Sequence, residues 1–299
     1  MEIALDTRII RDFGFTRGDA AFAALREVRG FGHRFRLADH AAVELVAQLD
    51  EGRFEWNDWK NARVRAAEII DRENPIIAGG WELFAALGLP VGDRTGQEQP
   101  VLRRDEAVAL WERLLSARNP TEFRELWRAI VEGREMLLGF KRGAGGEMLE
   151  GLRDRWITSF DAIVQRAALE NPDQDTLVKV VAAGIDTQAG WENPLCSVRI
   201  DSMIRTYAHL AVRRMKEKEP YNPRNKKKRN DGIDFDMLQY HGVPMLVCVE
   251  DRDFTNAVSG GNSIQRAWML TPRELAVACK NGTLPTLPDW SGGRTAAAK

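Results

Sequence analysis

The sequence predicts an α/β fold that is interrupted by a long helical segment, and three observations support this. Residues 2–5, EIAL, form a short run that ends at an aspartate, as a buried strand does at its carboxyl end. Residues 245–249, MLVCV, form a second apolar run that is rich in valine and followed by acids. Between residues 56 and 200, apolar residues recur at intervals of three and four, which is typical of amphipathic helices.

Helices are predicted between the two strands. Residues 22–30 and 41–49 have apolar spacing that suits helices following a strand in α/β fashion. Within the helical middle, the sequence Asn119-Pro120-Thr121 predicts a break followed by a capped helix start. Residues 200–219 predict a further helix, which ends before a basic connection.

Residues 267–275, AWMLTPREL, predict a last short strand and a helix that begins at Pro272 and is capped by Thr271. The changes of pattern along the chain divide it into three predicted parts. These are a discontinuous α/β domain over residues 1–55 and 200–283, a helical insertion over residues 56–199, and a loose C-terminal tail over residues 284–299.

The composition is that of a soluble globular protein. Of 299 residues, 44% are hydrophobic and 29% charged, and the formal net charge is −1. There is no window of eighteen apolar residues and no pattern of a secretory signal at the N-terminus, so we expect a cytoplasmic protein without a membrane segment. The three cysteines, widely separated and odd in number, indicate neither a disulfide framework nor a structural zinc site.

Acidic residues follow both predicted strands. Asp6 follows the first strand and Asp251 follows the second. Ligand sites of open α/β sheets lie outside the carboxyl ends of the strands, so two central parallel strands would bring these carboxylates together. Asp231 and Asp234 are three residues apart at the start of a predicted helix and share one face of it. Glu44 lies inside the apolar helix at 41–49, where a charged residue needs a partner.

Such a group of carboxylates points to bound divalent cations. Carboxylates that share one cleft repel one another unless cations neutralise them. Oxygen ligands suit Mg²⁺ or Mn²⁺, and a pair of these ions can activate a water and stabilise the leaving oxygen of a phosphodiester. The acids therefore predict phosphodiester hydrolysis.

The motifs that carry these acids resemble those of PIN-domain nucleases. ALDTRIIRD, from residue 4, resembles the strand-Asp-Thr opening of that family, and AAVELVAQL resembles its early helix with an acidic residue. NDGIDFDMLQY, from residue 230, resembles the third acidic motif. LVCVEDRDF resembles the late strand that closes in Asp-x-Asp-Phe, and WMLTPREL resembles the final strand and helix. The resemblance covers residues 1 to about 50 and 200 to 280.

The resemblance implies a Rossmann-like parallel sheet flanked by helices and a metal-dependent ribonuclease activity. It implies catalytic and metal-binding roles for Asp6, Glu44, Asp234 and Asp251, with Asp253 or Asp231 as supplementary metal ligands. The chain departs from the family pattern at Arg8, where asparagine is usual, and at Val249, where threonine or serine often precedes the aspartate.

A strongly basic segment precedes the predicted metal helix. Residues 213–229 contain nine Lys or Arg residues against two Glu. Phosphate backbones are what such a cluster binds best, so the segment predicts contact with nucleic acid. The candidate nucleic-acid-binding residues are Arg213, Arg214, Arg224, Lys226, Lys227, Lys228 and Arg229.

The predicted function is a metal-dependent nuclease, with RNA favoured over single-stranded DNA and its role as a toxin, a defence effector or a processing enzyme left open. The helical insertion would cap or flank the cleft, and it is a candidate surface for a protein partner or for self-association. Two alternatives stay open. A haloacid-dehalogenase-like phosphatase also places Asp after its first strand, but it needs a carboxylate two residues later, where this chain has Arg8. A non-catalytic PIN-like module would bind nucleic acid or protein without cleaving it.

Overall fold

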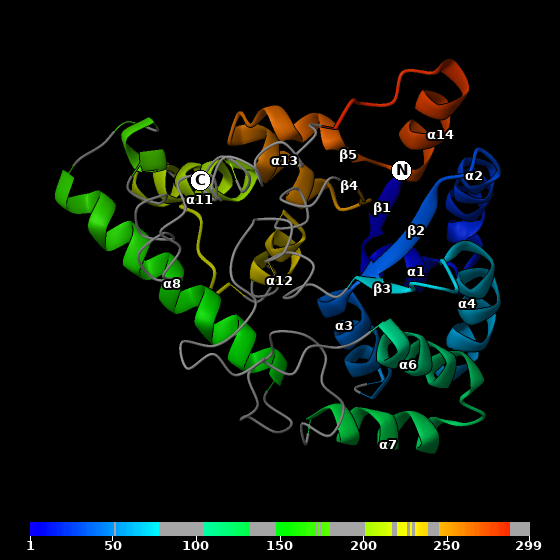
Figure 1. The fold of residues 1–299 in the computed structure, drawn as a ribbon. Helices are drawn as coiled ribbons and strands as arrows, with labels where there is room; N and C mark the ends of the chain where they lie inside the picture. The colour runs from blue at the N-terminus through cyan, green and yellow to red at the C-terminus, as the bar shows by residue number, and fades with distance from the viewer. Residues whose placement is uncertain are drawn as a thin grey trace, which may run out of the picture. The chain divides into compact units, whose positions relative to one another are not determined.

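The chain forms two compact units (Figure 1). The sheet unit contains residues 1–146, 243–250 and 268–299, and the helical unit contains residues 147–242 and 251–267. The structure is a computed structural model. It describes residues 1–50, 52–77, 104–131, 148–170, 173, 175–179, 201–216, 220–225, 228, 231–238 and 245–287. The predicted boundaries of the α/β domain and the helical insertion stay a prediction.

The sheet unit is built on five parallel strands in the order β3-β2-β1-β4-β5. The strands are β1 (Glu2–Leu5), β2 (Arg34–Ala38), β3 (Ile76–Ile77), β4 (Met245–Cys248) and β5 (Met269–Leu270). Side chains of successive strand residues point to opposite faces, yet the last three residues of β1 and all four of β4 are fully buried. Both faces of the central sheet are therefore covered, and the predicted α/β class is confirmed.

Seven helices of the sheet unit are described around these strands. They are α1 (Thr7–Asp12), α2 (Asp19–Gly30), α3 (Asp39–Asp50), α4 (Trp56–Ile69), α6 (Arg104–Ser116), α7 (Pro120–Val131) and α14 (Pro272–Asn281), with a 3-10 turn η1 (Thr16–Gly18). Helix α2 packs against both α4 and α14, and α3 packs against α7. The predicted helices at 22–30 and 41–49 are confirmed as α2 and α3.

Local sequence sets the ends of α14. Thr271 and Glu274 form a reciprocal capping box, Pro272 occupies the first turn, and Gly282 closes the helix in the left-handed conformation with φ of 63°. The start predicted at Thr271-Pro272 is confirmed. Of the C-terminal tail predicted at 284–299, residues 284–287 have no regular secondary structure, and residues 288–299 lie outside the described part of the chain.

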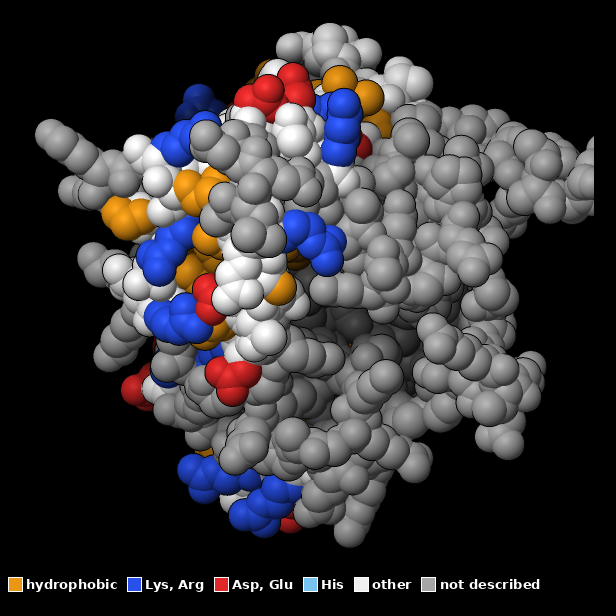
Figure 2. All heavy atoms as spheres, turned by 90° about the vertical axis from the view of Figure 1, so that its left-hand side faces the viewer, with side chains coloured by type: hydrophobic (Ala, Val, Ile, Leu, Met, Phe, Trp, Pro, Cys, Tyr) orange, Lys and Arg blue, Asp and Glu red, His pale blue; other side chains and the backbone are white. Residues whose placement is uncertain are grey.

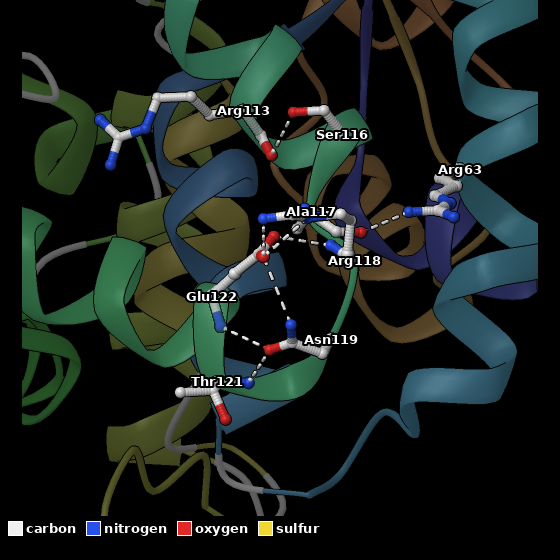
Figure 3. Close-up of polar contacts among 8 residues, drawn as sticks. All are labelled: Arg63, Arg113, Ser116, Ala117, Arg118, Asn119, Thr121 and Glu122. Atoms are coloured by element: carbon white, nitrogen blue, oxygen red, sulfur yellow. Dashed lines mark hydrogen bonds and ion pairs between the residues drawn. The ribbon is translucent and has the colours of Figure 1, made fainter.

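The predicted break at Asn119-Pro120-Thr121 also produces a capped helix, α7 (Figure 3). The Asn119 side-chain oxygen accepts hydrogen bonds from the backbone N–H groups of Thr121 and Glu122, each at 3.0 Å. The carboxylate of Glu122 reaches back to accept the Arg118 backbone N–H at 2.8 Å and the Arg118 guanidinium. The backbone bond to Arg118 is the main reason why the pKa of Glu122 is lowered. The end of α6 and the start of α7 are thus fixed together.

Strand β2 was not predicted, because two arginines interrupt its apolar pattern. Arg36 is nevertheless only 2% exposed. Its guanidinium donates to the Asn74 carbonyl and side-chain oxygens, to the Ile76 carbonyl and to the Glu2 carboxylate, over 2.8–3.1 Å. These bonds join β2 to the segment that leads into β3, so the buried charge is fully partnered.

The helical unit contains four described helices. They are α8 (Met148–Glu170), α11 (Asp201–Lys216), α12 (Asp231–Asp236) and α13 (Arg252–Gly260), and a 3-10 turn η3 (Ile264–Trp268) begins in this unit. The predicted helix at 200–219 is confirmed as α11. Aromatic rings form the core, with Trp156 lying 4.8–5.5 Å, centroid to centroid, from Phe160, Tyr207 and Phe235. Helix α13 ends close to α11, because a Cβ at Gly261 would lie 2.9 Å from the backbone of Arg205.

In the described part of the chain, no helix combines the length and the apolar character needed to cross a membrane. Cys248 is a free thiol buried in β4, and Cys279 is a half-buried free thiol in α14. Burial raises the pKa of both thiols. Cys196 lies outside the described residues.

Candidate functional site

The order of the strands reverses between β1 and β4. From β1 the chain continues to β2 and β3 on one side of the sheet, and β4 and β5 then lie on the other side of β1. Ligands of open α/β sheets bind outside the carboxyl ends of the strands at such a switch point. The topology therefore places the candidate site beyond the ends of β1 and β4.

Acidic residues leave the sheet at this point. Leu5 and Cys248 are partners at the ends of β1 and β4, and the Asp6 backbone N–H donates to the Cys248 carbonyl at 3.2 Å. Asp6 is 9% exposed, so it is not a solvated strand-end acid. It occupies the N-cap position of α1, but its side chain makes no capping hydrogen bond. Glu250 follows β4 at the same edge, and Asp251 is the next residue in the chain.

Glu44 lies buried in α3, with 9% exposure, and it has the partner that its position requires. The Gln48 side-chain amide donates to the Glu44 carboxylate at 2.8 Å, and Arg11 of α1 donates to the Gln48 oxygen at 3.2 Å. The Thr7 hydroxyl also donates to the Ala41 carbonyl at 3.3 Å, so the first turns of α1 and α3 are neighbours. These bonds hold Glu44 and the residues after Asp6 at one edge of the sheet.

Glu250 and Asp12 were not among the candidate site residues. Burial is the main cause that raises the pKa of Glu250; the negative charge of Asp12 adds to the rise, and Arg8 opposes it. Asp12 is paired with Arg17 at 2.8 Å and lies 3.9 Å from Arg8. Arg8 therefore brings a positive charge to this group of acids. The signal in the sequence was the position of Glu250 directly after a buried strand.

The other predicted acids belong to the helical unit, where the charges of Asp251 and Asp253 act on Asp231. Burial raises the pKa of Asp231 to about 6. Lys228 and the Tyr221 hydroxyl act to lower it, whereas Asp251 and Asp253 raise it further. The Tyr221 hydroxyl donates to Asp231 at 3.0 Å, and burial raises the pKa of that phenol. We call these three aspartates the acid cluster.

Lys228 provides a positive charge beside the acid cluster. Its ammonium group donates to the Asp253 carboxylate at 2.8 Å. Burial acts to lower the pKa of Lys228, but the bond to Asp253 and the charges of the three aspartates outweigh burial and raise it. The sequence predicted contact with nucleic acid for Lys228, and it gave no signal of the ion pair with Asp253.

Asp251 also has a structural role. It is the N-cap of α13, a helix that was not predicted, and its carboxylate accepts the Phe254 backbone N–H at 3.0 Å. Asp234 is a half-buried residue of the short helix α12. The candidate set is thus divided between the units, with Asp6 and Glu44 in the sheet unit and Asp234 and the acid cluster in the helical unit.

Carboxylate oxygens are the donors that Mg²⁺ and Mn²⁺ prefer, so the donor chemistry of these acids fits such an ion. Within the described ranges, however, no three His, Cys, Asp or Glu side chains are arranged as a ready-made metal site. Among the described residues, the ammonium group of Lys228 brings a positive charge to the acid cluster.

Several of the predicted nucleic-acid-binding cations contact groups of the chain itself. Arg224 makes a two-pronged ion pair with Asp161 of α8, and its pKa is raised by that bond. Arg214 donates to the Tyr221 carbonyl at 3.4 Å, and Arg213 lies in the last turn of α11. On the face shown in Figure 2, the described Lys and Arg side chains are interleaved with Asp and Glu. Lys226, Lys227 and Arg229 lie outside the described residues.

No family model, curated protein or solved structure matched the chain when it was compared with each of these.

Proposed function

We propose that the chain is a metal-dependent nuclease of the PIN-like type, which hydrolyses phosphodiester bonds with RNA favoured over single-stranded DNA. One observation carries the proposal: acids follow both of the strands that flank the switch point of the parallel sheet. The burial of Asp6 and of Glu44 supports it, because carboxylates that serve only for solubility stay in water.

The proposed residue roles follow the chemistry of the side chains. Asp6, Glu44, Asp234 and Asp251 would hold Mg²⁺ or Mn²⁺, with Asp253 or Asp231 as supplementary ligands. When bound, the ion would lower the pKa of a water and stabilise the charge that develops on the phosphate. Gln48 and Arg11 would keep the Glu44 carboxylate in place. The basic segment at 213–229 would contact the phosphate backbone.

The test is cleavage of labelled RNA and labelled single-stranded DNA by the purified full chain, with Mn²⁺ or with a chelator. We expect cleavage with the ion and none in chelator. Asp6→Asn and Glu44→Gln should each remove it, since each replaces a carboxylate by an amide of the same shape. The matched control is Asp19→Asn, which neutralises an acid of α2 that is 58% exposed and pairs with Arg65.

Two outcomes would contradict the proposal. Cleavage that persists in chelator would exclude the metal mechanism. Binding of RNA without cleavage at any Mn²⁺ concentration would favour the non-catalytic binding module instead.

A further inference from the structure

Two arginines of the sheet unit converge on one carboxylate, that of Asp12 at the end of α1. Arg17 of η1 donates from Nε to Asp12 Oδ1 at 2.9 Å, and its Nη2 lies 2.8 Å from the same oxygen. Arg8 Nε lies 3.9 Å from Oδ2. The Asp12 side chain is 9% exposed, whereas those of Arg8 and Arg17 are 45% and 60% exposed. One buried negative charge therefore holds two positive charges at the surface.

A tight backbone turn brings Arg17 back to Asp12. The Phe15 N–H donates to the Asp12 carbonyl, and the Gly18 N–H donates to the Phe15 carbonyl, each at 3.0 Å. The two segments approach so closely that a Cβ at Gly18 would lie 2.0 Å from the Asp12 carbonyl oxygen. The local backbone thus fixes where Arg17 begins.

An aromatic ring fixes the orientation of the Arg17 guanidinium. Its central carbon lies 4.3 Å from the centroid of the Phe15 ring. The Phe15 ring lies 6.1 Å from that of Phe54, which is buried and contacts the Trp59 ring in turn. The ring that carries Arg17 is therefore tied to the core. A guanidinium that is oriented in advance loses less conformational entropy when it binds a ligand.

Asp12 does not use all the donors of Arg17. A guanidinium presents five N–H groups in a planar fork, which matches the oxygens of a phosphate. Asp12 engages Nε and Nη2, and Nη1 has no hydrogen-bond partner among the described residues. The exposed end of this fork is thus suited to an anion from solution.

The two arginines lie beside the candidate site. Arg8 is two residues after Asp6, in the helix that begins where β1 ends. The charges of Arg8 and Asp12 both act on Glu250, which follows β4 on the other side of the switch point. A phosphate held here would lie at the carboxyl edge of the sheet, where ligands of such sheets bind.

We propose that Arg8 and Arg17 form a phosphate-binding site for single-stranded nucleic acid at this edge of the sheet, with Asp12 and Phe15 as residues that position the two guanidinium groups. The inference rests on the proposed function, because it takes a nucleic acid as the substrate. It adds a phosphate contact within the sheet unit to the contacts proposed for the basic segment at 213–229.

The experiment uses the full chain and a fluorescent single-stranded 2′-O-methyl RNA oligonucleotide, which resists cleavage. Anisotropy in chelator gives its dissociation constant at several salt concentrations for the wild type, Arg8→Met, Arg17→Met and Arg17→Lys. The matched control is Arg34→Met. Arg34 is 61% exposed and lies 3.8 Å from Asp71, but it stands at the start of β2 and thus at the opposite end of the parallel strands. Circular dichroism checks that each variant is folded.

Arg8→Met and Arg17→Met should each weaken binding by about ten-fold, the lower end of what a hydrogen bond to a charged group contributes. Each should also lower the slope of log affinity against log salt by roughly 0.7, the value for one phosphate of a single strand. Arg17→Lys keeps the charge beside Asp12 and should keep the slope. It should still bind more weakly than the wild type, because lysine lacks the planar fork. Arg34→Met should behave as the wild type does.

Wild-type affinity and slope in both Arg8→Met and Arg17→Met would overturn the phosphate site. Equal losses in Arg17→Met and Arg34→Met would overturn it as well, since they would show an effect of overall charge alone. Cleavage of RNA by the wild type with Mn²⁺ is assayed separately. If the wild type cleaves and both methionine variants bind normally, the proposed function stands without this site. If binding depends on the two arginines but nothing is cleaved, the site stands and the nuclease function fails.

Discussion

Asp251 combines a proposed metal ligand with an observed helix cap. Its carboxylate accepts the Phe254 backbone N–H at the start of α13, and its charge raises the pKa of Asp231. A substitution at this position can therefore alter activity, folding or both. The choice of the new side chain separates the two effects, because asparagine caps a helix about as well as aspartate and alanine does not.

We predict that Asp251→Asn abolishes cleavage and changes the free energy of unfolding by only a few tenths of a kcal/mol, or raises it slightly by relieving repulsion in the acid cluster. Asp251→Ala should abolish cleavage as well, and it should cost about 1 kcal/mol of stability through removal of the cap. Chemical denaturation and a cleavage assay on both variants measure this. Full activity in Asp251→Asn would mean that the residue serves only as a cap.

The raised pKa of Asp231 makes stability depend on pH. Its ordinary value is 3.8 and its value in the folded chain is about 6, so between these values the folded state holds the proton more tightly than the unfolded state does. The contribution of Asp231 to stability should therefore fall as pH rises from about 4 to about 6, by about 3 kcal/mol, and should then level off. Urea denaturation in chelator at a series of pH values would show this slope.

Asp231→Asn provides the control for this slope, which should become shallower in the variant. It should not vanish, because the pKa of Glu250 is raised as well and acts in the same direction. If stability depended on pH in the same way in the wild type and in Asp231→Asn, groups other than Asp231 would be the cause of that dependence.

At the scale of the element, the edge of the sheet at β3 depends on one buried arginine of β2. Arg36→Met should cost about 2–4 kcal/mol, because the buried carbonyl of Ile76 and the half-buried oxygens of Asn74 lose their donor. Glu2→Gln should cost less than about 1 kcal/mol, since the Glu2 side chain is 37% exposed. Thermal and urea unfolding of the two variants would test this. Similar losses of stability in both variants would show that the bonds of Arg36 to Asn74 and Ile76 do not hold β3 at this edge.

Arg36 also shows which elements the sequence could predict. Strands β1 and β4 were predictable, because a buried strand covered on both faces leaves a continuous apolar run. Strand β2 was not, because its arginine is buried through bonds to Asn74 and Ile76, about forty residues away. Helices α7 and α14 were predictable at their starts, since their capping residues are local.

The candidate site was predictable to a similar degree. The acids that follow strands could be found from local pattern, and the parallel pairing of β1 with β4 brings Asp6 and Glu250 to the same edge. The contacts of Gln48 with Glu44 and of Lys228 with Asp253 depend on tertiary packing and on side-chain reach. The sequence did not predict that Asp251 caps α13, because its position after a buried strand was interpreted as that of a metal ligand.

At the scale of the whole molecule, the basic segment should control how binding responds to salt. Replacing Lys226, Lys227 and Arg229 with Ala, with Lys228 kept, should weaken oligonucleotide binding for all sequences alike. The slope of log affinity against log salt should fall by roughly 0.7 for each phosphate of a single strand that the protein no longer neutralises. Anisotropy titrations at several salt concentrations measure the slope, with circular dichroism as the control for folding. An unchanged slope would place the nucleic-acid interface elsewhere on the chain.

The strand order also has a consequence for how the chain is made. Strands β1, β2 and β3 can pair once the first 77 residues have emerged, but the partner on the other side of β1 begins only at Met245. The roughly 170 residues between them take on the order of 10–30 s to synthesise. Throughout that time β1 is an apolar edge with unpaired backbone groups, the kind of surface that recruits strands of other molecules. Slow synthesis or truncation before β4 should therefore give aggregates, whereas completion of the chain closes the edge from within.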